Sequence, residues 1–142
     1  MTKHIAVLAL SLMLMGIVSA QNPGKTFTKP FSTDGAERIK FDLPGPIDLK
    51  IWHQATIRVE ISVDLPSGST SMLDQLAKVG RYDLSAENVN GELVVTSPNM
   101  HRVVRVKGEK LRENLSYVIY VPKDMDVVLL NSAAALADIQ NK

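Results

Sequence analysis

The sequence predicts an all-β protein, either a β-sandwich-like fold or an incipient β-solenoid, with one short helix near residues 71–79. Apolar and polar residues alternate with a period of two along most of the chain, which is the pattern of half-buried strands. Turn-forming Pro, Gly and Asn residues separate these runs at short intervals. A helical spacing of apolar residues occurs once, between residues 71 and 79.

The first twenty residues have the layout of a secretory signal peptide. A basic start with Lys3 is followed by an apolar run over residues 5–15, and Val18-Ser19-Ala20 supplies small residues for cleavage between Ala20 and Gln21. A membrane anchor needs about 20 apolar residues, and this run is shorter. We therefore expect an exported protein in the periplasm, on the outer surface or secreted, with no stable membrane insertion after cleavage.

The remaining chain divides into three parts. Residues 21–26 contain Pro23-Gly24 and are expected to be a flexible mature N-terminus. Residues 27–131 form the β-rich domain. Residues 132–142 are Ala-rich and then strand-like, which predicts a C-terminal tail or a truncated further strand.

Three alternating runs open the β-rich domain, over residues 37–43, 47–51 and 56–64. Pro44-Gly45-Pro46 separates the first two runs, and a short turn separates the second from the third. Because the connections are short and one face of each run is apolar, the pattern predicts an antiparallel meander.

A short helix follows, and then further strands. Ser71 is the expected N-cap, with Asp74 at capping-box spacing, and Gly80 suits the helix exit. Asn90-Gly91 predicts a hairpin, because both turn positions need positive φ. Strands are expected at 82–86, 92–96, 101–107, 115–121 and 127–131, with a polar connection over 108–114. The expected core comprises Ile39, Phe41, Leu49, Ile51, Ile57, Val59, Ile61, Leu76, Leu93, Val95, Ile119 and Val121.

Composition narrows the classes of function. The chain has no cysteine, which excludes disulfides, thiolate catalysis and cysteine metal sites, and favours a bacterial envelope origin. Of the 16 Lys and Arg residues, only Lys3 falls in the signal segment, so the rest balance the 15 Asp and Glu residues. A neutral mature chain argues against a nucleic-acid partner and against strong attraction to an anionic membrane.

The order of several short segments resembles a known family. These segments are Ile39-Lys40-Phe41-Asp42, Pro46–Ile51, Thr56–Ile61, the helix around Leu73–Leu76, Asn90–Val95, Tyr117–Pro122 and Val127–Asn131. Together they resemble the "putative adhesin" family of bacterial envelope proteins, the head GIN domain and its relatives. The resemblance implies a β-rich, solenoid-like domain behind a signal peptide, and it brings no catalytic residues. Longer members continue into further rungs where this chain stops, so the resemblance implies a C-terminal truncation.

The sequence predicts no enzyme, no cofactor and no metal site. His53 and His101 are the histidines that follow the signal segment, and neither has a second ligand at metal-binding spacing. The chain lacks G-x-S-x-G, and Pro66-Ser67-Gly68-Ser69 has ordinary loop composition. We therefore expect no catalytic residues.

The stretch from residue 101 to residue 112 is the clearest local charge asymmetry. It contains Arg102, Arg105, Lys107, Lys110 and Arg112, and the acidic residues Glu109 and Glu113 partly offset their charge. One interpretation is a contact for an anionic polysaccharide, lipopolysaccharide or an acidic partner. The alternative is a solvated edge strand that positive charge protects against aggregation.

The few aromatic residues have two interpretations as well. Trp52, Tyr82, Tyr117 and Tyr120 could line a sugar-binding platform, or they could pack in the core. Tyr117 and Tyr120 point to opposite faces of a regular strand, so at least one is expected to be core.

The leading functional hypothesis is a non-enzymatic, adhesin-like envelope or secreted protein. It would bind a glycan or a surface protein through a strand face or edge. The alternative hypothesis is a structural N-terminal module of a longer β-solenoid with no ligand of its own, in which the next rung completes the burial of the core.

Overall fold

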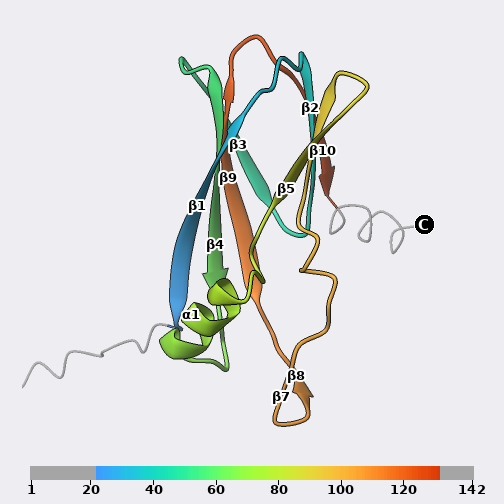
Figure 1. Ribbon diagram of the computed structural model, residues 1–142. Helices are drawn as coiled ribbons and strands as arrows, with labels where there is room; N and C mark the ends of the chain where they lie inside the picture. The colour runs from blue at the N-terminus through green and yellow to red at the C-terminus, as the bar shows by residue number, and fades with distance from the viewer. Residues whose placement is uncertain (1–21, 132–142) are drawn as a thin grey trace, which may run out of the picture.

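The computed structural model describes residues 22–131, which fold as two four-stranded sheets packed face to face (Figure 1). Sheet A has the strand order β1-β4-β9-β3, and sheet B has the order β10-β2-β6-β5. The strands are β1 (Gly24–Ser32), β2 (Arg38–Leu43), β3 (Ile47–Trp52), β4 (Thr56–Asp64), β5 (Ser85–Val89), β6 (Glu92–Thr96), β7 (Arg105–Val106), β8 (Glu109–Lys110), β9 (Asn114–Pro122) and β10 (Asp126–Asn131). The all-β prediction is confirmed, and of the two architectures left open the described residues form a sandwich.

The core lies between the central strands of the two sheets. Alternate residues of β4, from Ile57 to Val63, are almost completely buried, and so are Ile39, Phe41 and Leu43 of β2. They join buried residues of β6 and β9 in one hydrophobic cluster. Burying such side chains stabilises a fold by about 1.5–3 kcal/mol each, so this alternation accounts for the sandwich.

Of the twelve expected core residues, nine are buried, two are partly buried and one is exposed. Leu49 and Leu76 are only partly buried, and Ile51 is 66% exposed. Ile51 lies on the inward face of β3 beside buried Val121, but β3 is an edge strand of sheet A. The prediction of Ile51 as a core residue is wrong, because alternation gives the face of a strand but not its place in the sheet.

The expected antiparallel meander of the first three runs is also wrong. β2 belongs to sheet B and pairs in parallel with both β10 and β6. Pro44-Gly45-Pro46 carries the chain across to sheet A, where β3 pairs in parallel with β9 rather than with β4. Two prolines and a glycine at φ +152° make a corner between sheets and not a hairpin.

The first described strand begins inside the segment expected to be a flexible N-terminus. β1 begins at Gly24 and pairs with β4 up to Asp64, so Gly24–Thr26 are part of a strand and not of a flexible N-terminus over residues 21–26. The signal peptide over 1–20, its cleavage site at Ala20 and Gln21, and the tail over 132–142 lie outside the described residues.

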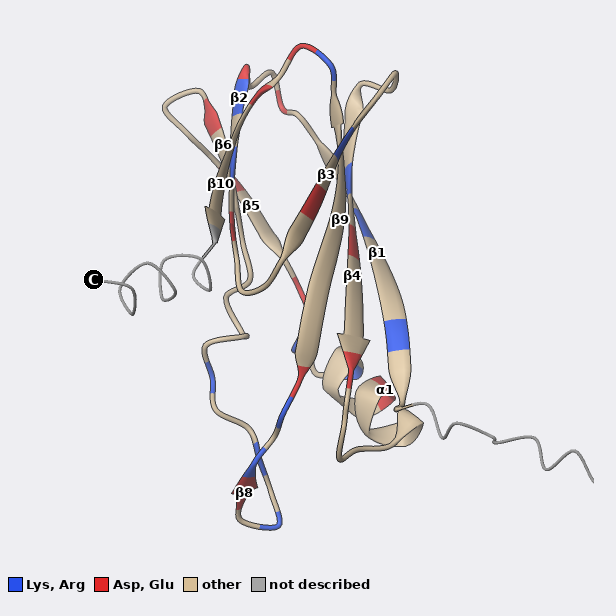
Figure 2. Ribbon diagram, turned by 180° about the vertical axis from the view of Figure 1, so that it is seen from behind, with Lys and Arg blue, Asp and Glu red and all other residues tan. Residues whose placement is uncertain are grey.

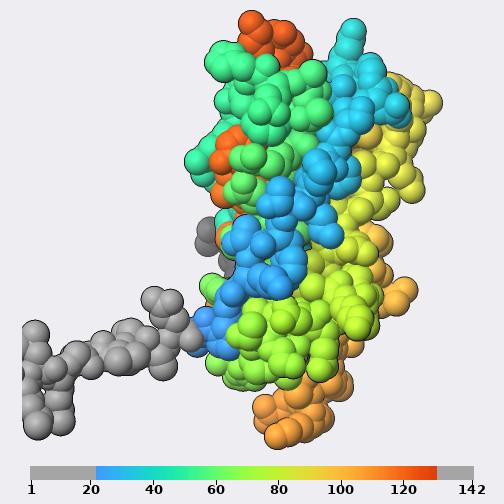
Figure 3. All heavy atoms as spheres, turned by 60° about the vertical axis from the view of Figure 1, so that its left-hand side comes forward, coloured from blue at the N-terminus to red at the C-terminus, as the bar shows by residue number. Residues whose placement is uncertain are grey.

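The predicted helix is present as α1 (Thr70–Lys78), which covers one end of the sandwich through buried Leu73 (Figures 1 and 3). Its cap differs from the prediction. Ser69, not Ser71, is the N-cap and accepts a hydrogen bond from the Met72 amide at 3.1 Å. Asp74 instead accepts a hydrogen bond from Lys25 of β1 at 2.6 Å, which ties the helix to the edge of sheet A.

The Asn90-Gly91 hairpin is confirmed. β5 and β6 pair antiparallel around it, with φ values of +52° and +82° at the two turn residues. The expected strand over 101–107 is mostly wrong, since only Arg105 and Val106 are in a strand. They form a small separate sheet with β8, which lies inside the region expected to be a polar connection.

Candidate binding surfaces

The five predicted basic residues come together on and beside the β7–β8 hairpin. The hairpin turns at Lys107-Gly108, both with positive φ, and pairs Arg105 directly with Lys110. It projects beyond the end of the sandwich (Figures 1 and 3) and carries several of the cations in Figure 2. Arg102, Arg105, Lys107, Lys110 and Arg112 are all exposed.

The two faces of this hairpin differ. Arg105 and Lys110 stand opposite one another in the ladder and therefore share one face, and Arg112 follows beyond the end of β8 as an exposed residue. Leu111 faces the other way and packs partly buried against the core, and its amide donates to the Val104 carbonyl at 2.8 Å. The hairpin therefore rests on its apolar side and presents its cations to solvent.

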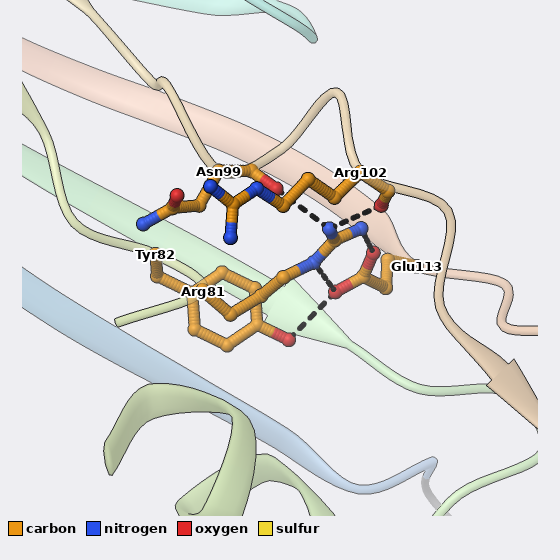
Figure 4. A network of polar contacts seen from close by, with 5 residues as sticks. All are labelled: Arg81, Tyr82, Asn99, Arg102 and Glu113. Atoms are coloured by element: carbon orange, nitrogen blue, oxygen red, sulfur yellow. Dashed lines mark hydrogen bonds and ion pairs between the residues drawn. The ribbon is translucent and has the colours of Figure 1, made fainter. Parts of the chain in front are cut away.

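A buried ion pair closes the base of the segment that carries the hairpin (Figure 4). Nη2 of Arg81 lies 2.6 Å from Oε2 of Glu113, and Nε donates to Oε1 at 3.3 Å. Nη1 of Arg81 donates to the carbonyls of Asn99 and Arg102 at 2.8 and 2.6 Å. One guanidinium thus joins the helix exit to both sides of the hairpin's base.

Two tyrosines border this network. The Tyr82 hydroxyl donates to Oε1 of Glu113 at 2.8 Å, and its ring stacks on Phe27 with centroids 5.2 Å apart. Burial raises the pKa of Tyr82 well above its ordinary range, and the hydrogen bond to Glu113 and its charge add to the shift. Burial also raises the pKa of Tyr117 to about 12, again with a contribution from Glu113. Both hydroxyls are therefore held protonated.

A second candidate surface lies on the outer face of sheet A. Trp52 and Tyr120 approach with ring centroids 5.2 Å apart. The Arg58 guanidinium carbon lies 4.3 Å from the centre of the Tyr120 ring and 5.0 Å from that of Trp52. Lys50 lies 6.0 Å from the Tyr120 ring centre, and Glu60 pairs with Arg58 at 3.2 Å. We call Trp52, Arg58 and Tyr120 the aromatic–arginine cluster.

The sheet register positions the aromatic–arginine cluster. Tyr120 stands opposite Arg58 on β4 and opposite Lys50 on β3. The indole N–H of Trp52 donates to the Thr56 carbonyl at 2.7 Å, which fixes the ring over the β3–β4 turn. The three side chains are therefore held in place on paired strands.

The aromatic residues divide between the two interpretations. Tyr82 and Tyr117 are each 2% exposed and belong to the core, whereas Tyr120 and Trp52 lie outside it. The expectation that Tyr117 and Tyr120 face opposite ways is confirmed. Only the second pair remains available as a platform.

His53 lies in the β3–β4 turn and His101 lies between β6 and β7, far apart in the chain, and both are exposed. Among residues 22–131, no group of three or more His, Asp or Glu side chains is arranged to hold a metal ion. None of the helices in the same part of the chain is long and apolar enough to cross a membrane.

Sequence reasoning missed the Arg81–Glu113 pair and the aromatic–arginine cluster. The members of the ion pair are separated by 32 positions, and nothing local distinguishes them from solvated charges. The cluster unites β3, β4 and β9, and its only sequence signal is that Trp52 and Tyr120 occupy the outward phase of their strands.

Comparison with known protein families finds no matching family model, and comparison with curated proteins finds no match either. A search of solved structures finds a protein from Clostridium sporogenes ATCC 15579 described as a "putative cell adhesion protein". The sequences are 14% identical, with a TM-score of 0.44. The similarity covers 76% of this chain and 46% of the other, so this chain spans less than half of that neighbour's length.

Proposed function

We propose that this protein is an exported, non-enzymatic, adhesin-like domain that binds a glycan or a protein partner through the outer face of sheet A. The aromatic–arginine cluster is the observation that carries the proposal. Trp, Tyr and Arg are the residue types that dominate the energy of binding surfaces. Here one of each is gathered on a face that the core does not use.

The geometry suits either kind of partner. Aromatic rings stack on the apolar faces of pyranose sugars. Lys50 near the Tyr120 ring, its partner Asp48, and Glu60 beside Arg58 supply groups that can hydrogen-bond hydroxyls. For a protein partner, rigid rings supply contact area at low entropic cost. Arg58 braces both rings, so little ordering is left to be done on binding.

The test uses Trp52, the single tryptophan of the chain, as a fluorescent reporter. The purified protein would be titrated with cellohexaose, chitohexaose, fibronectin and collagen while the tryptophan emission is recorded. We expect at least one probe to shift the emission and the Tyr120→Ser variant to weaken that binding about tenfold or more. Ser116→Ala, on the same face of β9, is the matched control and should bind as the parent does. Emission that no probe changes, or binding that Tyr120→Ser leaves intact, would contradict the proposal.

A second candidate function is the structural module of a longer β-solenoid. The parallel pairing of β10, β2 and β6 favours it, because in-register parallel strands are the arrangement of stacked rungs. The edge strands β3 and β10 also leave apolar side chains exposed, with Ile51 at 66%, Leu129 at 40% and Leu130 at 44%. A broad thermal transition of the purified protein would favour this role, and a cooperative one would favour the independent binding domain.

A further inference from the structure

The cations of the hairpin differ from those of the sandwich in their partners. On the sheets, Lys25, Lys29, Arg38, Lys40, Lys50 and Arg58 each pair with a carboxylate. Within residues 22–131, none of Arg102, Arg105, Lys107, Lys110 and Arg112 forms an ion pair. Five cations without an ion pair among the described residues are therefore gathered at the end of the sandwich that carries the hairpin.

These cations are arranged along a surface and not at a point. Arg105 and Lys110 stand directly opposite one another, and Arg112 follows two residues after Lys110 as a further exposed cation. Like charges placed directly opposite across a ladder repel each other. A single cation is enough to protect an edge strand against aggregation, so protection does not require two cations opposite each other. The arrangement therefore favours an anionic ligand as the explanation for the pair.

The segment that carries the cations is also held in place before any ligand arrives. Arg81 binds the Arg102 carbonyl on the approach to the hairpin and the Glu113 carboxylate on the way out. Leu111 anchors the opposite face against the core. A pre-ordered array loses little conformational entropy on binding, which raises the affinity available from modest exposed contacts.

We propose that the exposed face of the β7–β8 hairpin binds a linear anionic polysaccharide through its sulfate or carboxylate groups. Arg105, Lys110 and Arg112 make the contacts, with Lys107 and Arg102 at the two ends of the array. An extended polyanion matches cations that follow a strand direction. A lipid surface is disfavoured because the hairpin turns at Lys107-Gly108, whereas exposed Val103 lies at the base of the hairpin and not at its tip.

The experiment compares dextran sulfate with uncharged dextran of the same length, by isothermal titration calorimetry at several salt concentrations. We expect the purified protein to bind dextran sulfate and not dextran, with an affinity that falls steeply as salt rises. The triple variant Arg105→Gln, Lys110→Gln, Arg112→Gln should weaken binding about tenfold or more and flatten the salt dependence.

The control removes charge elsewhere. Lys78→Gln with Lys123→Gln deletes two exposed cations that are likewise without an ion pair among the described residues, one on α1 and one after β9. This control should keep the parent affinity to within about threefold. An equal loss in the control would show general charge attraction and overturn the proposal. So would absent binding to dextran sulfate, or binding to vesicles containing phosphatidylglycerol without binding to dextran sulfate.

This inference is separable from the proposed function of the outer face of sheet A. The hairpin and the aromatic–arginine cluster share no residue and no ion pair. Tyr120→Ser should therefore leave dextran sulfate binding unchanged, and the hairpin variant should leave the Trp52 response unchanged. Failure of one site then leaves the other to be judged on its own data.

Discussion

Arg81 and Glu113 form a two-point ion pair inside the protein, with side chains that are 9% and 6% exposed. All three guanidinium nitrogens of Arg81 donate hydrogen bonds. Nε and Nη2 donate to Glu113, and Nη1 donates to the carbonyls of Asn99 and Arg102. A buried pair of this kind adds little stability over a well-packed apolar pair. The pair instead joins Arg81 to the long segment between β6 and β9, through Glu113 and the carbonyls of Asn99 and Arg102.

Breaking this pair on one side should be costly. Glu113→Ala leaves the Arg81 charge buried and removes the acceptor of the Tyr82 hydroxyl, so we expect a loss of about 3–5 kcal/mol of unfolding free energy. Urea denaturation followed by circular dichroism measures it. Asp126→Asn breaks the exposed Arg38 pair instead and should cost less than about 1 kcal/mol. A similar loss in both variants would contradict the special place given to Arg81 and Glu113.

A charge in the centre of β4 should unfold the protein. Val59 is completely buried between the sheets, and Val59→Asp places a carboxylate there with no partner, at an expected cost above about 4 kcal/mol. Ser116→Asp adds the same charge to the exposed outer face of β9 and should change stability by less than about 0.5 kcal/mol. Thermal melts of the two variants give the comparison, and an unchanged melting temperature for Val59→Asp would mean that the assigned face of β4 is wrong.

Local patterns in the sequence were enough to predict most strands and the faces of the central ones. The alternation from Ile57 to Val63 gives both, and the Asn90-Gly91 turn gives a hairpin, because each depends on neighbours in the chain. Sheet order is different, since it depends on contacts between distant segments. Ile51 shows the consequence, because the same alternation that buries Val59 leaves it exposed at an edge.

The two candidate surfaces also differ in how much of each could be predicted from the sequence. The basic residues of the hairpin are contiguous in sequence, so their grouping could be predicted, although their anchoring by Arg81 could not. The aromatic–arginine cluster required the parallel register of β3 and β9 and the antiparallel register of β4 and β9. Neither register follows from periodicity, which sets the face of a strand but not its partner.

Glycine should matter more at the corner between sheets than at the hairpin turn. A Cβ on Gly45 would lie 2.9 Å from the Leu115 carbonyl oxygen, with φ at +152°, whereas one on Gly91 would meet nothing within 4 Å. Gly91→Ala should therefore cost about 1–2 kcal/mol from backbone strain alone. Gly45→Ala should lower the free energy of unfolding by more, because the new Cβ would clash with the backbone oxygen of Leu115, and the backbone there would have to shift. Equal losses by urea denaturation would mean that the corner can relax.

Export should remove the first twenty residues. We expect the mass of the protein recovered from the periplasm or medium of an expressing bacterium to correspond to a chain beginning at Gln21. Ala20→Arg should block this cleavage, since the site requires a small residue, whereas Gln21→Ser lies after the cut and should be processed normally. An exported chain that retains Met1 would contradict the assignment of a signal peptide.

Alkaline pH should destabilise the protein through its buried tyrosines. The pKa of Tyr117 is raised to about 12 in the folded protein, and burial raises that of Tyr82 as well, whereas both hydroxyls titrate near pH 10 when the chain unfolds. Above about pH 10 the unfolded state therefore binds fewer protons than the folded state, so unfolding becomes more favourable with rising pH. Stability should be steady below about pH 10 and fall between about pH 10 and 12, by up to about 1.4 kcal/mol per pH unit for each tyrosine. Urea denaturation at a series of pH values measures this slope, and Tyr117→Phe should reduce it. A slope that Tyr117→Phe leaves unchanged would show that other groups govern the alkaline transition.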